Sequence, residues 1–363
     1  MYQNPLDSNY LTADDVLLSP QSGVLASRND AQIQPFIYSS PMDTITGKDM
    51  ADAMVELGEY PVVCRYLSDW AEVFAEHHDN PNVWFAVGAD LFPLDGGIKF
   101  LLKNKQFQNA QLSICVDIAH GDSPLGRQAI ERLAAIPQVK NIMCGSIATP
   151  FQARAMVAAG ATHLRIGIGP GSVCTTRLMT GVGVPQLSAV YNIHRGLGLL
   201  RSKVKLISDG GIRHPGDAVK YMAAGADAVM MGSMFKACPE TPGWRLDKES
   251  VDSLRFENPE WDDIEVPEEV ATRLVKRYRG QASASFQKSQ GFKFKCAEGA
   301  ETSEIEQGAF AVEVIEQFRG GLTSALSYLG MTSSLDLEPD NVEFIRITPS
   351  GLSENRPHAV VAQ

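Results

Sequence analysis

The chain has 363 residues, 44% of them hydrophobic, and a formal net charge of -11 at pH 7. It is long enough to bury a large core, and its acidity disfavours a nucleic-acid-binding surface. Its six cysteines show no paired zinc spacing and no Cys-x-x-Cys motif, which favours free thiols in a reducing compartment. With no signal-peptide pattern and no apolar run approaching ~18 residues, we predict a cytoplasmic protein that neither spans a membrane nor binds nucleic acid.

The first segment, residues 1–35, is an irregular lead-in with the acidic pair Asp14–Asp15, and we expect it to pack beside the main domain. From Phe36 onward, short apolar runs alternate with amphipathic segments, as in β/α repeats. The apolar runs predict eight strands, at residues 36–40, 61–65, 83–87, 112–116, 140–144, 163–166, 205–208 and 227–231. The segments between them predict helices at 47–57, 69–76, 125–135, 150–159, 186–200 and 215–224.

Eight β/α repeats predict a closed (β/α)8 TIM barrel over residues 36–235. An open doubly wound sheet is the alternative, but no Gly-x-Gly-x-x-Gly follows the first strand. We expect residues 1–363 to form a single catalytic domain, because the length suits one barrel of roughly 250 residues with additions. After the barrel we expect an excursion and mobile flap at 236–305, a closing helix at 306–330, and a polar tail at 331–363, poorly ordered near its end.

Polar residues follow most of the predicted strands. Because the carboxyl ends of barrel strands share one rim, where barrel enzymes keep their sites, these residues should lie near one another. They include Ser39, Met42, Arg65, Asp117, His120, Gly121, Ser146, Asp209, Gly211, Gly232 and Ser233. Short glycine-rich turns after the last strands favour a phosphate group, so the sequence predicts a phosphorylated small molecule.

The loop after the sixth predicted strand, residues 166–177, carries three glycines, a proline, three hydroxyls, Arg177 and the thiol of Cys174. Glycine and proline at this density exclude a regular helix or strand. A cysteine on such a loop is placed to attack an electrophilic carbon. The alternative interpretation is a small buried apolar residue, which is the commoner fate of a free cysteine.

Two runs in this region, residues 169–177 (GPGSVCTTR) and 181–190 (GVGVPQLSAV), resemble the catalytic-cysteine loop of the IMP dehydrogenase/GMP reductase family. The resemblance extends from Asp14 to about residue 330 and is weakest at 68–111 and 236–277. It implies a (β/α)8 barrel that acts on a purine nucleoside monophosphate (GMP or IMP) with a nicotinamide cofactor. It also implies a homotetramer and a monovalent cation, usually potassium.

The resemblance also implies roles for individual residues. Cys174 is the expected nucleophile, and Thr176 and Glu298 the expected proton relay, with Glu301 and Glu304 as competitors for the glutamate. The expected substrate contacts are Ser39, Met42, Ser172, Asp209, Gly211, Gly232, Ser233, Tyr278, Gly280, Gln281 and Ser283. The expected cofactor contacts are Asp117, His120, Gly121, Arg65 and Gly167, and the cation would be held by the carbonyls of Gly167, Gly169 and Cys174.

The family contains two activities, and the sequence favours the reductase. A dehydrogenase flap carries an Arg–Tyr pair that activates water, whereas residues 289–299 here contain Phe292–Lys293–Phe294–Lys295 and no such pair. Most dehydrogenases of the family also carry a regulatory domain inserted after the second strand, and none fits between residues 65 and 83 here. We therefore expect an NADPH-dependent GMP reductase. IMP dehydrogenase is the alternative, because the segments at 39–43, 119–121 and 231–233 look more like dehydrogenase versions. Departures from the family pattern at Arg65, Ser146 and Gln281 leave open a non-catalytic nucleotide-binding barrel or a reductase acting on a related purine nucleotide.

Overall fold

The computed structural model describes residues 6, 10–91, 110–246, 274–293 and 296–355. Its centre is a sheet of eight parallel strands in the order β2-β9-β8-β7-β6-β5-β4-β3. The bounds are β2 (Ile37–Ser39), β3 (Val62–Val63), β4 (Trp84–Val87), β5 (Leu112–Asp117), β6 (Val139–Ile147), β7 (His163–Ile166), β8 (Lys205–Asp209) and β9 (Ala228–Met231). All eight predicted strands are present, within a few residues of the expected bounds.

The sheet closes on itself between its first and last strands. Tyr38 in β2 and Tyr60, just before β3, form a parallel bridge. Ser39 N donates to Tyr60 O at 3.1 Å, and Tyr60 N donates to Ile37 O at 3.0 Å. This closure confirms the (β/α)8 barrel and rejects the open doubly wound sheet.

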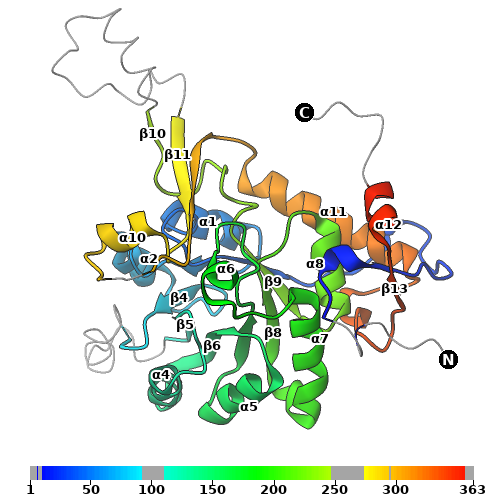
Figure 1. Cartoon of the computed structure of the whole chain (residues 1–363), viewed down its shortest axis with the longest axis horizontal. Helices are drawn as coiled ribbons and strands as arrows, with labels where there is room; N and C mark the ends of the chain where they lie inside the picture. The colour runs from blue at the N-terminus through cyan, green and yellow to red at the C-terminus, as the bar shows by residue number, and fades with distance from the viewer. Residues whose placement is uncertain (1–5, 7–9, 92–109, 247–273, 294–295, 356–363) are drawn as a thin grey trace, which may run out of the picture.

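Helices surround the barrel (Figure 1). They are α1 (Lys48–Glu56), α2 (Trp70–His77), α4 (Pro124–Ala134), α5 (Pro150–Ala159), α7 (Gln186–Leu197), α8 (Pro215–Ala223) and α11 (Ala311–Tyr328). Local chemistry fixes their ends: Ser123 and Thr149 accept N-terminal backbone hydrogen bonds ahead of a proline in the first turn. The helix expected at 186–200 ends earlier, at Leu197, where Gly198 has a φ of 52° and a 3-10 turn, η5 (Gly198–Lys203), follows.

The lead-in and the tail meet beside the barrel. Strand β1 (Val16–Leu18) pairs antiparallel with β13 (Phe344–Arg346), with Val16 opposite Arg346. The lead-in also contacts two barrel helices: Leu11 N donates to Ser188 Oγ at 2.6 Å, and Lys220 Nζ donates to Ala13 O at 2.9 Å.

The end of the tail departs from expectation. Helix α12 (Pro349–Glu354) extends into the stretch from residue 353 onward that we expect to be poorly ordered, so residues 353 and 354 are helical. Its first turn is capped, because Thr348 Oγ1 accepts from Gly351 N. Residues 356–363 of the predicted tail lie outside the described residues.

The segment expected as excursion and flap contains a three-stranded antiparallel sheet, in the order β10-β11-β12. The strands are β10 (Arg245–Leu246), β11 (Leu274–Arg279) and β12 (Glu301–Glu306), and α10 (Ala284–Ser289) lies between the last two. The part of the flap at 301–304 is therefore a strand and not irregular, although residues 247–273 and 294–295 lie outside the described residues. Buried Lys276 of β11 donates to Thr44 O at 2.8 Å, which attaches the sheet to the loop after β2.

Within the described residues, the helices include none that is both long and apolar enough to cross a membrane.

Candidate active site

The loop after β7 places Cys174 at the rim, half-buried, just before the short helix α6 (Thr176–Thr180). The thiol of Cys174 donates to Thr176 Oγ1 at 3.2 Å. Arg177 stabilises the loop through two hydrogen bonds to backbone carbonyls: its Nε donates to Ile168 O at 2.8 Å, and its NH2 group donates to Val184 O. A Cβ added to Gly169, whose φ is 83°, would lie 2.5 Å from Arg177 Cγ. The loop shape therefore requires glycine at this position.

The flap segment at residues 298–300 contacts the cysteine loop, residues 166–177, through backbone hydrogen bonds. Thr175 N donates to Glu298 O at 2.9 Å, and Ala300 N donates to Val173 O at 2.8 Å. Cys174 and Gly299 form an antiparallel bridge, and the Cys174 Sγ lies 3.9 Å from Glu298 O. Backbone pairing thus brings the loop that carries Glu298 next to the thiol.

The two competitors for the glutamate role are engaged elsewhere. Glu301 accepts from Ser285 Oγ at 2.7 Å and lies 3.5 Å from Arg277 NH1. Glu304 forms an ion pair with Arg245. Both residues lie on β12, whereas Glu298 lies on the loop that touches Cys174. The geometry therefore favours Glu298 over either neighbour.

Four of the expected substrate residues form one cluster. Tyr278 Oη lies 3.7 Å from Met42 Sδ and is hydrogen-bonded with Ser172. A Cβ added to Gly232 would lie 3.1 Å from both Met42 Sδ and Tyr278 Oη, so only glycine leaves room there. Burial raises the pKa of Tyr278 to about 12, which keeps its hydroxyl a proton donor. Ser233 follows Gly232 after β9, and Gly211 follows Asp209 after β8 with a φ of 74°.

The expected purine-edge residues lie where the flap meets the cysteine loop. Gly280 N donates to Ala300 O at 3.0 Å, and Gln281 Nε2 donates to Pro41 O. Ser283 caps α10 by accepting from Phe286 N and is 2% exposed. Ser39 is fully buried, and its Oγ accepts from Thr46 Oγ1 at 2.9 Å. The hydroxyls of Ser39 and Ser283 are thus engaged inside the protein and not presented at the rim.

Arg165 is the central charge of the site, and the sequence analysis missed it. It is 6% exposed, and its NH1 group lies 2.7 Å from Asp117 Oδ1 while its Nε lies 3.4 Å from Asp209 Oδ2. Burial raises the pKa of Asp209 to about 6, although the Arg165 guanidinium opposes this shift. Asp117, expected at the cofactor, and Asp209, expected at the ribose, therefore share one buried cation.

The expected cofactor contacts include one buried acceptor without a partner. Asp117 Oδ2 is buried and has no hydrogen-bond partner among the described residues. Gly121 is buried against β6: a Cβ added to it would lie 3.1 Å from Gly145 Cα, and its N donates to Ser146 O at 2.9 Å. His120 Nε2 lies 3.2 Å from Gln152 Nε2, and the guanidinium of Arg65 stacks over the ring of Tyr66 at 4.4 Å. An orphaned carboxylate oxygen fits a hydrogen-bond donor such as the amide group of a nicotinamide.

The expected monovalent cation would share its loop with Arg177. Gly167 and Gly169 lie in the same turn as the Ile168 carbonyl, which accepts a hydrogen bond from Arg177. Gly167 has a φ of 152°, and a Cβ added to it would clash with Asp209 O. Two cations in one turn repel each other unless each has its own acceptors.

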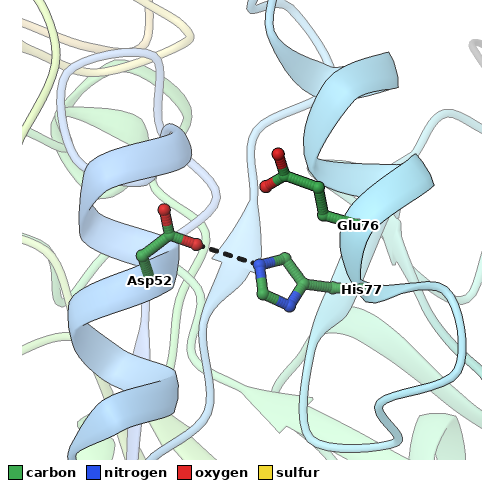
Figure 2. Close-up of side chains that lie close together, drawn as sticks. All are labelled: Asp52, Glu76 and His77. Carbon is green, nitrogen blue, oxygen red and sulfur yellow. Dashed lines mark hydrogen bonds and ion pairs between the residues drawn. The ribbon is translucent and has the colours of Figure 1, made fainter.

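One carboxylate–histidine cluster lies away from this rim, between two helices (Figure 2). Asp52 of α1 points toward His77 of α2, with 2.9 Å between Asp52 Oδ1 and His77 Nε2, and Glu76 lies beside them. The Lys48 ammonium is hydrogen-bonded to both carboxylates. It offsets part of their negative charge, and we assign no metal site there.

The protein is a (β/α)8 barrel with a cysteine, Cys174, on the loop after β7. At the same rim, Arg165 forms a buried ionic group with Asp117 and Asp209. A sequence model of the IMP dehydrogenase / GMP reductase domain matches residues 94–253 and 264–358. The chain belongs to the IMP dehydrogenase/GMP reductase family.

Curated relatives agree with this assignment. The inosine-5'-monophosphate dehydrogenase of Chlorobaculum tepidum is 36% identical over 264 residues, which cover 68% of this chain and 48% of the relative. That of Thermoplasma acidophilum is 36% identical over 257 residues, covering 68% of this chain and 47% of the relative. The chain thus spans about half the length of these two relatives. That of Borreliella burgdorferi is 28% identical over 422 residues, which cover 98% of each protein.

Proposed function

We propose that this protein is a GMP reductase that converts GMP to IMP and ammonia with NADPH as the reductant. The observation that carries the proposal is the backbone pairing of the Glu298 loop with the Cys174 loop, which brings Glu298 near a thiol that is hydrogen-bonded to Thr176. Family membership supports a purine nucleoside monophosphate as the substrate class. The homotetramer and the cytoplasmic location stay predictions of the proposal, as does activation by potassium.

The chemistry assigned to Cys174 is covalent. Its deprotonated Sγ forms a bond to C2 of the purine, and the bond from C2 to the amino nitrogen breaks. Ammonia is a poor leaving group unless it is protonated, so an acid is needed at this step. Thr176 Oγ1, 3.2 Å from Sγ, passes the proton from Glu298 to the departing nitrogen. The nucleophile thereby divides one difficult substitution into two easier steps.

The remaining groups hold the nucleotide. Tyr278, Ser172 and the backbone at Gly232 would bind the phosphate, because together they offer hydroxyl donors and room beside a glycine. Asp209 would accept from the ribose hydroxyls, and Gly280 and Gln281 would contact the purine edge. When bound beside Asp117 and Gly121, the reduced nicotinamide supplies a hydride to C2. The bond between C2 and Sγ then breaks, which returns the thiolate of Cys174 and releases IMP.

The flap favours reduction over hydrolysis. The one Arg–Tyr pair of the late chain, Arg277–Tyr278, lies in β11, where Tyr278 is 3% exposed beside Met42 and Arg277 pairs with Glu301. Neither side chain belongs to the loop that contacts Cys174. A flap loop whose sequence carries no Arg–Tyr pair favours release of ammonia and acceptance of hydride over hydrolysis.

IMP dehydrogenase is the second candidate, because the curated relatives named above carry that name. In that reaction C2 of IMP, bound to Cys174, loses a hydride to NAD, and water then hydrolyses the bond to Sγ. This function would require a water-activating group other than an Arg–Tyr pair of the flap.

Absorbance at the nicotinamide band, run in both directions, tests the choice. One sample holds GMP and NADPH, and the other holds IMP and NAD with potassium. We expect oxidation of NADPH only with GMP, together with release of ammonia. Reduction of NAD only with IMP would replace the proposal by the dehydrogenase. No absorbance change in either sample would favour a related purine nucleotide as the substrate, or a role in binding without catalysis.

Replacing Glu298 with Gln should lower the rate of ammonia release about 100-fold, because a general acid contributes roughly 10²–10⁴-fold. Binding of GMP should be nearly unchanged, because the backbone of Glu298, and not its side chain, holds the loop on Thr175. Glu301→Gln is the matched control, since it removes a nearby flap carboxylate that already has its own partners. Equal loss in both variants, measured by stopped-flow with excess enzyme, would argue against a specific acid role for Glu298.

A further inference from the structure

A cavity of about 610 Å³ opens at the mouth of the barrel opposite the candidate active site. Its lining residues come from the amino ends of the strands, including Tyr38 of β2, Trp84 of β4 and His163 of β7. The active-site loops, in contrast, follow the carboxyl ends of the same strands. The cavity is therefore a separate site, and its size lies in the range of pockets that hold small molecules.

Aromatic rings form much of the wall. Tyr38 and Tyr60 stack with their ring centroids 4.5 Å apart, and Trp84 meets Tyr38 edge-on at 6.0 Å. Trp84 also meets the ring of His163 at 4.6 Å. Because Tyr60 is only half-buried, it offers remaining ring surface to the cavity. Flat aromatic walls favour a flat ligand, which stacks on them or meets their edges.

The lining carries no net charge. Asp227 lies 2.9 Å from Arg201 NH2 and 3.1 Å from Lys205 Nζ, and Glu338 supplies a second carboxylate. Burial lowers the pKa of His163 to about 4, so the ring is neutral near pH 7. A lining in which the cations are already paired does not favour a phosphate or another polyanion.

One polar group of the cavity wall is left for a ligand. Asn141 donates its amide nitrogen to Ser113 Oγ at 3.0 Å, which leaves its amide oxygen as an acceptor. Trp84 is 1% exposed and contributes packing surface behind the wall.

We propose that this cavity binds an uncharged planar heteroaromatic molecule of nucleoside size. The aromatic wall holds the ring system, and Asn141 accepts from a ring N–H or amino group. The site is independent of the reductase reaction, because none of the residues assigned to that reaction lines it.

Calorimetric titration of the full chain with guanosine and with adenosine tests the site, alongside the fluorescence of Trp84. We expect at least one nucleoside to bind and to change the fluorescence, with binding retained when GMP is present at saturating concentration. Tyr60→Leu should weaken the binding at least 10-fold while keeping the protein folded, because Tyr60 is half-buried at the mouth. Trp84→Phe should remove the fluorescence change and weaken the binding several-fold.

Tyr328→Leu is the matched control, because Tyr328 is 70% exposed on α11 and lies outside the cavity. It should bind the nucleoside as the unaltered protein does. The proposal is overturned if neither nucleoside binds, if Tyr60→Leu binds as tightly as Tyr328→Leu, or if GMP displaces the nucleoside. Tighter binding of GTP at the cavity, lost in Tyr60→Leu, would also overturn the assignment of an uncharged ligand.

Discussion

Replacing Cys174 with Ala should abolish turnover while leaving GMP binding measurable. Loss of a covalent nucleophile typically lowers kcat by about 10⁴-fold or more. The phosphate and ribose contacts assigned to Tyr278, Ser172 and Asp209 do not involve the thiol, so calorimetry should show GMP affinity within a few-fold of the unaltered protein. Mass spectrometry of the quenched enzyme should show a purine adduct in the unaltered protein and none in the variant.

Cys238→Ala is the control, because Cys238 is a buried free thiol outside the candidate site. It should keep its activity and its adduct. Cys174→Ser tests the chemistry more narrowly, since it retains a hydrogen-bonding group of similar size beside Thr176. Substantial turnover in Cys174→Ala would end the covalent proposal.

Arg165→Met should lower kcat/KM at least 100-fold and destabilise the fold. Removing one partner of a buried ionic group leaves uncompensated charge, at a cost of roughly 3–5 kcal/mol. Here two carboxylates, Asp117 and Asp209, lose the same cation. Arg165→Lys keeps the charge but cannot reach both carboxylates with a planar fork, so it should fold and recover only part of the activity. Arg213→Met, at an exposed arginine that pairs with Asp14, is the control and should leave kcat/KM unchanged.

The pH profile distinguishes positioning by Arg165 from a merely structural role. With its pKa near 6, Asp209 ionises as the pH rises through about 6, so nucleotide binding should strengthen across that interval. The same raised pKa means that the contribution of Asp209 to folding stability is present below about pH 4 and lost as the pH rises through 6. The lysine of Arg165→Lys should lower the pKa of Asp209 less than the arginine does. The acid limb of the kcat/KM profile should therefore move to higher pH. An unmoved limb would show that Arg165 does not control the ionisation of Asp209.

The barrel could be predicted because its strands are short apolar runs separated by glycine, proline and amphipathic segments. Even β3, reduced to Val62–Val63, stands out between Pro61 and the polar residues after Arg65. The pairing of β1 with β13 could not be predicted, since Phe344–Arg346 contains one buried side chain in an otherwise polar tail. The glutamate-rich sequence of β12 resembled a loop because both faces of that strand are largely exposed.

The loop residues of the candidate site, and Asp117 and Asp209 at the ends of their strands, could be predicted, whereas Arg165 inside β7 was missed. Arg165 interrupts the apolar run of β7, and a charged residue in a strand buried on both faces implies a buried partner. That signal was present in the sequence, but it named no partner, because Asp117 and Asp209 meet Arg165 only after the barrel closes. The cavity at the opposite mouth left no pattern, because its lining comes from single residues spread along the whole chain.

The ladder between β1 and β13 bears on how the chain folds during synthesis. The 330 positions from Val16 to Arg346 separate the two strands along the chain, so β1 must wait while the intervening segment is synthesised before its partner leaves the ribosome. Pairing between such distant segments carries a high entropic cost of loop closure and forms slowly. The barrel can therefore close first, with the lead-in held on α7 and α8 by Leu11 and Ala13. Until β13 arrives, β1 exposes an unpaired edge, and ribosome-bound chains are at that stage open to pairing with one another.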